Sequence, residues 1–159
     1  MAKKPKLSHV DAKGRVAMVD VTAKATTDRV AVACCDISMS AKARTAIRTG
    51  AVKKGDPLQA ARLAGIMGAK QTSALIPLCH PLPISYADVQ IVPTRLGYRI
   101  TATVRTTGQT GVEMEALTAA AVAALTVYDM VKAVDKGMVV DGLCLVEKRG
   151  GKSGTYRRV

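Results

Sequence analysis

The fold is organised around residues 111–137, which read GVEMEALTAAAVAALTVYDMVKAVDKG. After Val112 this stretch contains no Pro, and its only further Gly is the last residue, Gly137, which is well placed to end a helix. Most of its residues are strong helix formers. Residues 116–127 are apolar or small on every face of such a helix, and this pattern is typical of a helix buried on all sides. We therefore predict a long buried helix with charged residues only at its two ends.

Charged side chains mark both ends of this predicted helix. Glu113 and Glu115 lie in its first turn, where the helix dipole favours anions. Asp129 and Lys132 lie near its other end, three positions apart, and can touch. Glu115 and Asp129 share roughly one face and lie about 21 Å apart along the axis. Two copies packed antiparallel would bring the acids of one copy near the Asp129–Lys132 pair of the other. Alternatively, the acids only complement the dipole and the pair is solvated.

Length and composition indicate a single globular domain. The chain has 159 residues, of which 48% are hydrophobic. The basic start is not followed by an apolar stretch, and no apolar run reaches the roughly 20 residues of a membrane helix. We therefore expect a cytoplasmic protein without a signal peptide or membrane span. The four cysteines show no CxxC spacing, so we expect them reduced and without zinc: they are Cys34, Cys35, Cys79 and Cys144.

The formal net charge of +12 indicates polyanionic partners, either nucleic acid or a small substrate that carries phosphates. Phe and Trp are absent and only four Tyr occur. Because single-stranded nucleic acid is usually held by aromatic stacking, the chain is poorly equipped to bind it. Binding of duplex or ribosomal RNA through Lys and Arg stays open on charge alone.

The pattern along the chain predicts an α+β fold. Residues 1–16 are polar, basic and unpatterned, and we predict a flexible arm there, followed by a single domain at 17–159. The predicted elements are a strand at 29–37, helices at 40–48 and 56–72, a hairpin at 88–93 and 98–105, the central helix and a strand at 142–148. This β-α-α-β-β-α-β order predicts a ferredoxin-like antiparallel sheet with helices on one face. Self-association is the simplest way to cover the other face.

Three further motifs suit anions. Residues 53–56 read KKGD and place two lysines before a helix N-terminus, although a solvated basic loop explains them equally well. His80 lies in the proline-stiffened segment 75–83 and is a candidate acid–base group or phosphate ligand; a hydrogen-bonded structural histidine is the alternative. The ending GGKSG lacks the upstream Gly and the following helix of a P-loop, but Lys148, Lys152 and glycine N–H groups suit an anion nest.

In combination these blocks resemble one family. The blocks are MVDVTAK (18–24), KGD (54–56), LIPLCHPL (75–82), TGVEMEALTAAAVAALTVYDMVKAVDKGM (110–138) and GGKSG (150–154). They are similar to molybdenum cofactor biosynthesis protein C, the family of cyclic pyranopterin monophosphate synthases. The resemblance covers roughly residues 17–154, in order and with ordinary spacings. No single block is specific for this family, but the combination of LCHP, GVEMEAL and YDM-x-K is specific for it.

The resemblance implies a lyase of molybdenum cofactor biosynthesis. Such an enzyme converts a cyclised dihydro-GTP into cyclic pyranopterin monophosphate and releases pyrophosphate. It needs no cofactor, although magnesium can accompany the triphosphate. It is a homohexamer, a trimer of dimers with sites between subunits, and it acts after the radical GTP-cyclising enzyme and before molybdopterin synthase. No nucleic acid or membrane partner is implied. The alternative is a basic RNA-binding protein without catalytic activity.

The resemblance also implies the site residues. The expected catalytic residues are Asp129, Lys132 and Lys54. The expected substrate-binding residues are His80, Glu113, Glu115, Lys152, Lys148, Lys24, Arg29, Cys79 and Met114. We expect the basic groups to hold phosphates and the acids and His80 to contact the base or activate water. If Lys132 is desolvated, its pKa falls enough for acid–base work. No metal ligand set is present in the sequence.

Overall fold

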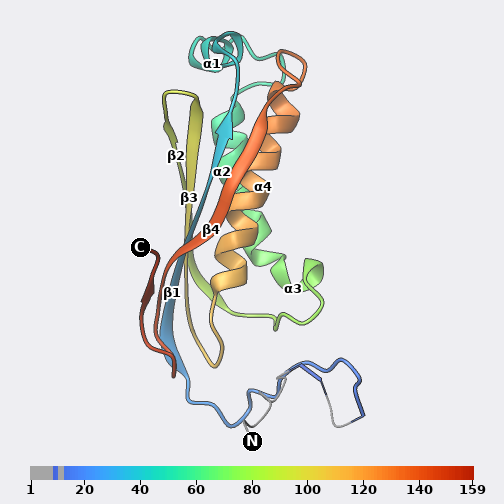
Figure 1. The fold of residues 1–159 in the computed structure, drawn as a ribbon, viewed down its shortest axis with the longest axis vertical. Coiled ribbons are helices and arrows are strands. Elements are labelled where there is room, and N and C mark those ends of the chain that lie inside the picture. The colour runs from blue at the N-terminus through green and yellow to red at the C-terminus, as the bar shows by residue number, and fades with distance from the viewer. Residues whose placement is uncertain (1–8, 11–12) are drawn as a thin grey trace, which may run out of the picture.

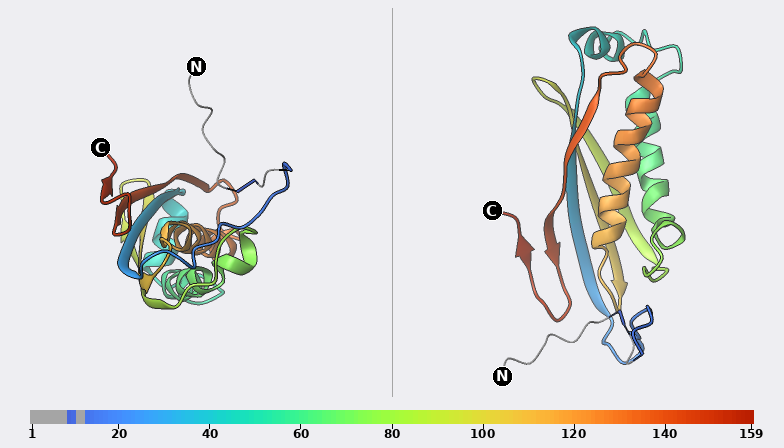
Figure 2. Two further views of the ribbon diagram at one scale, coloured as in Figure 1. Left: turned by 90° about the horizontal axis from the view of Figure 1, so that it is seen from below. Right: turned by 45° about the vertical axis from the view of Figure 1, so that its right-hand side comes forward.

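The computed structural model describes residues 9–10 and 13–159. The elements are β1 (Thr27–Ser38), α1 (Ala41–Arg48), α2 (Pro57–Lys70), α3 (Thr72–Leu75), β2 (Ile84–Pro93), β3 (Gly97–Gly108), α4 (Glu113–Val131), β4 (Val139–Arg149) and β5 (Tyr156–Arg157). The strands form one antiparallel sheet in the order β2-β3-β1-β4-β5. α2 and α4 lie together on one face of this sheet and α1 lies at one end (Figure 1), as Figure 2 shows from the side. The predicted α+β fold is confirmed.

Two short elements are missing from the predicted order. α3 has four residues and β5 has two, and segments of this length carry no readable periodicity. Of the predicted arm at 1–16, residues 1–8 and 11–12 lie outside the described residues. The described part contains a bridge between Val10 and Val16.

Side-chain caps start α1 and α2, whereas α4 ends at Val131 and not at the predicted Gly137. The carboxylate of Asp56 accepts hydrogen bonds from the backbone N–H groups of Leu58 and Gln59 at 2.9 and 3.1 Å, and Pro57 is the first residue of α2. Ser40 Oγ accepts from Ala43 N at the start of α1. These caps fix the direction of α2 and thereby the position of the KKGD loop before it.

Strand alternation places the core between the sheet and the helices. Along β3, Tyr98, Ile100, Ala102 and Val104 are buried. Along β1 the inward residues except Ile37 are small, and the Cys35 thiol lies 3.5 Å from the Ala120 carbonyl oxygen of α4. Small side chains on both elements therefore allow α4 to lie close to the centre of the sheet.

Glycines in α2 permit an equally close approach to α4. A Cβ added at Gly65 would lie 2.8 Å from the Ala119 carbonyl oxygen, and one at Gly68 would lie 3.0 Å from Val122 side-chain atoms. The facing residues of α4 are mostly buried alanines: Ala116, Ala119, Ala120, Ala123 and Ala124. Both glycines therefore allow α2 to pack closely against α4.

The prediction that α4 is buried on all sides is wrong for the single chain. Leu125, in the middle of the helix, is 62% exposed, and Met114 near its start is also exposed. The reason is geometric: the sheet and α2 cover only part of the helix circumference, and the remaining stripe is bare. α2 extends this apolar surface with Leu63 and Met67.

α4 also corrects the expectation about membrane-length segments. With 19 residues it is long and apolar enough to cross a membrane by length and composition alone. It nevertheless packs against β1, β3 and α2 as the central helix of the domain. Core helices of such domains pass the same test of length and composition.

Candidate functional site

A lysine–aspartate cluster forms at the C-terminal end of α4. Asp129 accepts from Lys132 Nζ at 2.8 Å and from Lys54 Nζ at 2.6 Å, each through a different carboxylate oxygen. Lys54 Nζ also donates to the Asp129 backbone carbonyl at 3.0 Å. The Asp129–Lys132 contact follows from their spacing. Lys54 comes from the loop before α2, so the fold joins the three residues for which catalysis was predicted.

The cluster is exposed and fully charged. Hydrogen bonds from Lys132 and Lys54 lower the pKa of Asp129 to about 2. Asp129 in turn raises the pKa of Lys132, whose side chain is 51% exposed. The single chain therefore does not meet the condition of a desolvated Lys132, because the Asp129 carboxylate lies beside the ammonium group and about half of the side chain is exposed. As it stands, the cluster carries one net positive charge and suits an anion.

An acidic pocket lies at the other end of α4. It encloses about 420 Å³ between the N-terminal segment, the proline-stiffened loop and the start of the helix. Six of the predicted substrate-binding residues line it, namely Lys24, Cys79, His80, Glu113, Met114 and Glu115. Sequence blocks that lie far apart in the chain thus meet in one place.

The two glutamates differ in environment. Glu115 is 4% exposed, and burial raises the pKa of its carboxyl group. Burial, followed by the charge of Glu115, also raises the pKa of the Cys79 thiol. Glu113 is one-third exposed and lies 3.7 Å from Lys148 Nζ. Burial thus favours the neutral, hydrogen-donating form of Glu115, while the more exposed Glu113 has a lysine partner.

A basic pocket adjoins the acidic one, and Lys24 and Thr110 line both. It encloses about 860 Å³ and includes Arg29 and Lys152. Arg29 is oriented by the carbonyl oxygens of Gly108 and Gln109, to which it donates at 2.9 and 3.1 Å. The glycine-rich ending forms a wall: a Cβ added at Gly151 would lie 3.0 Å from Arg29 Cζ. Lys148 reaches this wall through its hydrogen bond to Ser153.

The fold does not bring all the predicted residues into one site. The lysine–aspartate cluster and the acidic pocket lie at opposite ends of α4, about 21 Å apart along its axis by the rise of an α-helix. Figure 1 shows this helix running along the sheet. Within one chain the predicted residues therefore form two half-sites.

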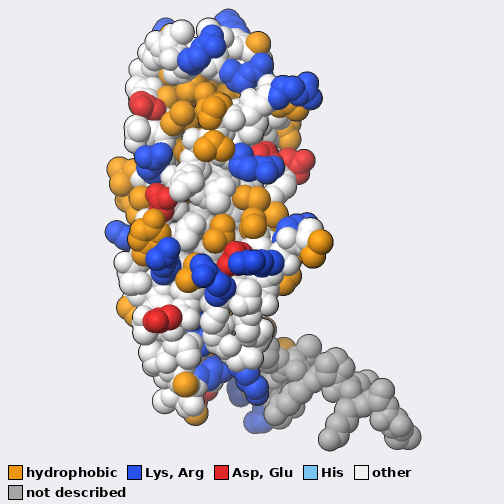
Figure 3. Space-filling model, turned by 90° about the vertical axis from the view of Figure 1, so that its left-hand side faces the viewer, with side chains coloured by type: hydrophobic (Ala, Val, Ile, Leu, Met, Phe, Trp, Pro, Cys, Tyr) orange, Lys and Arg blue, Asp and Glu red, His pale blue; other side chains and the backbone are white. Residues whose placement is uncertain are grey.

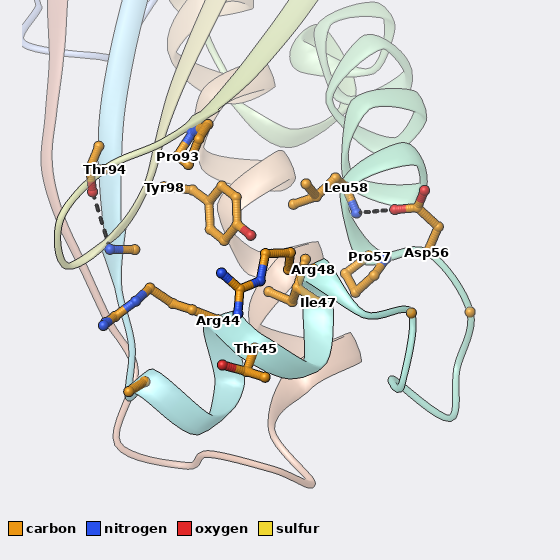
Figure 4. Close-up of a pocket in the computed structure, with 14 residues that line it drawn as sticks. Arg44, Thr45, Ile47, Arg48, Asp56, Pro57, Leu58, Pro93, Thr94 and Tyr98 are labelled. Carbon is orange, nitrogen blue, oxygen red and sulfur yellow. Dashed lines mark hydrogen bonds between the residues drawn. The ribbon is translucent and has the colours of Figure 1, made fainter.

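A further cavity is separate from both half-sites. It encloses about 910 Å³ between α1, the start of α2 and the β2–β3 hairpin. Figure 4 shows Tyr98 and Arg48 pointing into the same space above Ile47. None of the predicted site residues lines it, so it does not guide the assignment of the site.

Sequence reasoning missed His9 and Thr110, which line the acidic pocket. His9 falls in the arm that carries no periodic pattern, and Thr110 belongs to a polar glycine loop. Within the described ranges, no group of three His, Cys, Asp or Glu side chains is arranged to hold a metal ion.

Comparison with known proteins identifies the family. Residues 18–151 match the model of the MoaC family. The chain is 59% identical to the cyclic pyranopterin monophosphate synthase of Jannaschia sp., over 95% of this chain and 94% of that protein. It is 58% identical to the protein of that name from Dinoroseobacter shibae, over 94% and 96%. It is 55% identical to cyclic pyranopterin monophosphate synthase 2 of Mycobacterium tuberculosis, over 96% and 91%. The RNA-binding alternative gains no support, and the chain belongs to the MoaC family.

Proposed function

We propose that this chain is a cyclic pyranopterin monophosphate synthase, a lyase of molybdenum cofactor biosynthesis. The observation that carries the proposal is nearly full-length identity of 55–59% to enzymes of that name. Its substrate is a cyclised dihydro-GTP, and pyrophosphate is released. The net charge of +12 suits a triphosphate substrate.

The two pockets bind different parts of the substrate, according to the charge of each part. Arg29, Lys24 and Lys152 of the basic pocket bind phosphate oxygens. The adjacent acidic pocket takes the purine-derived part, where the carboxyl groups of Glu113 and Glu115 form hydrogen bonds to polar ring edges. Because Lys24 lines both pockets, it binds where base and phosphates join.

The lysine–aspartate cluster supplies the chemistry. Lys54 and Lys132 offset charge on the departing pyrophosphate and move protons as the ring is opened and rebuilt. Asp129 orients both lysines through hydrogen bonds of 2.6 and 2.8 Å. Replacing Lys54 or Lys132 by Ala is expected to abolish turnover without unfolding the protein, since both side chains are about half exposed.

The complete site lies between two subunits. The bare apolar stripe of α4 and α2, with Leu125, Leu63 and Met67, is a surface that another copy can cover. An antiparallel partner helix would place its lysine–aspartate cluster against the acidic pocket of the first chain. The assembly is then a homohexamer of three dimers. The other face of the sheet, where Figure 3 shows apolar and basic side chains interspersed, is a further contact surface.

Three further features come from the resemblance. The strand order β2-β3-β1-β4, with a helix on each crossover, supports the ferredoxin-like class. The enzyme is cytoplasmic and acts after the radical GTP-cyclising enzyme and before molybdopterin synthase. It needs no cofactor of its own beyond magnesium carried by the triphosphate.

The activity is tested by pyrophosphate release from enzymatically prepared cyclised dihydro-GTP, with the product identified by mass. Formation of the cyclic monophosphate together with pyrophosphate is the expected result. An intact, folded protein that releases none from verified substrate would overturn the proposed function.

The shared site is tested by mixing two inactive variants, Lys132→Ala and Glu115→Ala. In a mixed dimer one site takes Glu115 from one chain and Lys132 from the other, so it contains no substitution. Random re-association restores about one quarter of the wild-type sites, given two-fold symmetry. If both residues act within one chain, no activity returns, and the intersubunit site is wrong.

A further inference from the structure

The N-terminal segment forms one wall of the acidic pocket. His9, Val19, Val21 and Lys24 all line the cavity. The described part of the segment begins as a small hairpin, in which Ala17 N donates to the His9 carbonyl oxygen at 3.0 Å. His9 is thereby placed at the pocket although it lies far in sequence from the other lining groups.

Two side chains from distant parts of the sequence tie this segment in place. His80 Nε2 lies 2.8 Å from the Val19 carbonyl oxygen. Gln109 Nε2 donates to the Thr22 carbonyl oxygen at 3.1 Å. Because a carbonyl oxygen only accepts, His80 Nε2 carries the proton of that bond. The Nε2 atom of His80 is thus used in the hydrogen bond that holds the N-terminal segment at the pocket.

The imidazole of His9 is not committed in this way. His9 is exposed and lines the pocket, and no residue in the described part of the chain engages its ring by a hydrogen bond or ion pair. The two histidines of the chain therefore meet at one cavity in different states. One ring holds the backbone, and the other, which has no partner among the described residues, can contact whatever enters.

We infer that His9 is a further catalytic residue of this site and that His80 is the positioning residue that holds the segment carrying it. The inference rests on the proposed function. The neighbouring groups are a buried carboxyl and a carboxylate paired with Lys148. An imidazole can accept a proton from a substrate N–H or O–H at one ring nitrogen and return it from the other. His9 supplies this exchange at the purine-derived end of the substrate.

The test compares four variants with the wild type by steady-state pyrophosphate release. His9→Ala is expected to lower kcat about 100-fold or more, the usual range for loss of a proton-transfer group. Added imidazole is expected to restore part of that kcat. Val16→Ala, in the same hairpin but not at the pocket, is the matched control and keeps wild-type rates.

The His80 variants test the positioning role. His80→Ala is expected to raise KM and to speed amide hydrogen exchange in residues 19–24, with no rescue by imidazole. His80→Gln retains an Nε donor for Val19 and is expected to keep the slower exchange. His9→Ala leaves this exchange unchanged.

Three results separate the possibilities. If wild-type protein releases no pyrophosphate, the proposed function itself fails. If the wild type is active and His9→Ala matches its kcat, only the present inference fails. A His9→Ala variant that loses activity, exchanges faster in residues 19–24 and is not rescued by imidazole assigns His9 a structural role and also overturns the inference.

Discussion

Replacing Gly111 by Ala is expected to impair activity with little effect on folding. Gly111 precedes α4, and the Glu113 carboxyl group folds back against its Cα. Its φ is not positive, so Ala can adopt the same backbone conformation. The added methyl group acts on one neighbour, the end of the Glu113 side chain, which we assign to substrate binding.

The size of the effect follows from one distance. A Cβ on Gly111 would lie 2.7 Å from Glu113 Cδ. Of the two carboxylate oxygens of Glu113, Oε2 would be nearer than this and Oε1 would lie 2.9 Å away. Carbon atoms are comfortable at about 3.5–4.0 Å, so the carboxyl group must move by about 1 Å. A misplacement of about 1 Å at a reacting site costs on the order of 100-fold in rate. Shifting one flexible side chain off its preferred rotamer costs only about 0.5–1.5 kcal/mol.

The assay measures kcat/KM for pyrophosphate release alongside urea unfolding followed by circular dichroism. Gly108→Ala is the matched control, because its Cβ would meet Thr106 side-chain atoms at an ordinary 3.7 Å. Gly108→Ala is expected to keep wild-type activity. A Gly111→Ala variant with wild-type kcat/KM, or one that loses activity only because it unfolds, would refute the reasoning.

Two further predictions concern stability. Gly65→Ala is expected to lower the free energy of unfolding by about 1 kcal/mol. Overpacking against the Ala119 backbone costs roughly 1–3 kcal/mol, whereas the gain in helix propensity is about 1 kcal/mol. Urea unfolding at fixed protein concentration measures the difference, and a variant as stable as the wild type or more stable would contradict the prediction. Because the pKa of Asp129 is lowered from 3.8 to about 2, its carboxylate stabilises the folded chain at pH values above 3.8, and this contribution is lost as the pH falls through about 2. The difference in urea midpoint between wild type and Asp129→Asn is therefore expected to be constant near neutral pH and to shrink below about pH 4; a difference that grows on acidification would disprove the assignment.

The parts of the fold that were predictable are those set by local rules. The alternation of Tyr98, Ile100 and Ala102 identifies β3 because side chains of a strand point to opposite faces in turn. Asp56 and Pro57 mark the start of α2 because capping is a contact between neighbours in sequence. Neither inference needs knowledge of the rest of the chain.

The parts that were not predictable depend on neighbours distant in sequence. The contact of Lys54 with Asp129 joins residues 75 positions apart, and no spacing rule anticipates it. The raised pKa of Lys132 has its main cause in the hydrogen bond to Asp129, a contact that their spacing does allow, but the degree to which both side chains are exposed depends on the rest of the fold. His9 was missed because a site residue on an unpatterned segment leaves no periodic signal.

The exposed middle of α4 shows what hydropathy alone can and cannot say. The pattern of residues 116–127 correctly indicates an apolar helix, but Leu125 stays 62% exposed in the single chain. If a second copy covers this stripe, as proposed, the same contact removes water from the lysine–aspartate cluster at the helix end. Desolvation disfavours the ammonium form and opposes the effect of Asp129 on the pKa of Lys132. Lys132 then becomes a better proton donor in the assembly than in the single chain, so completing the site and activating its lysine are one event.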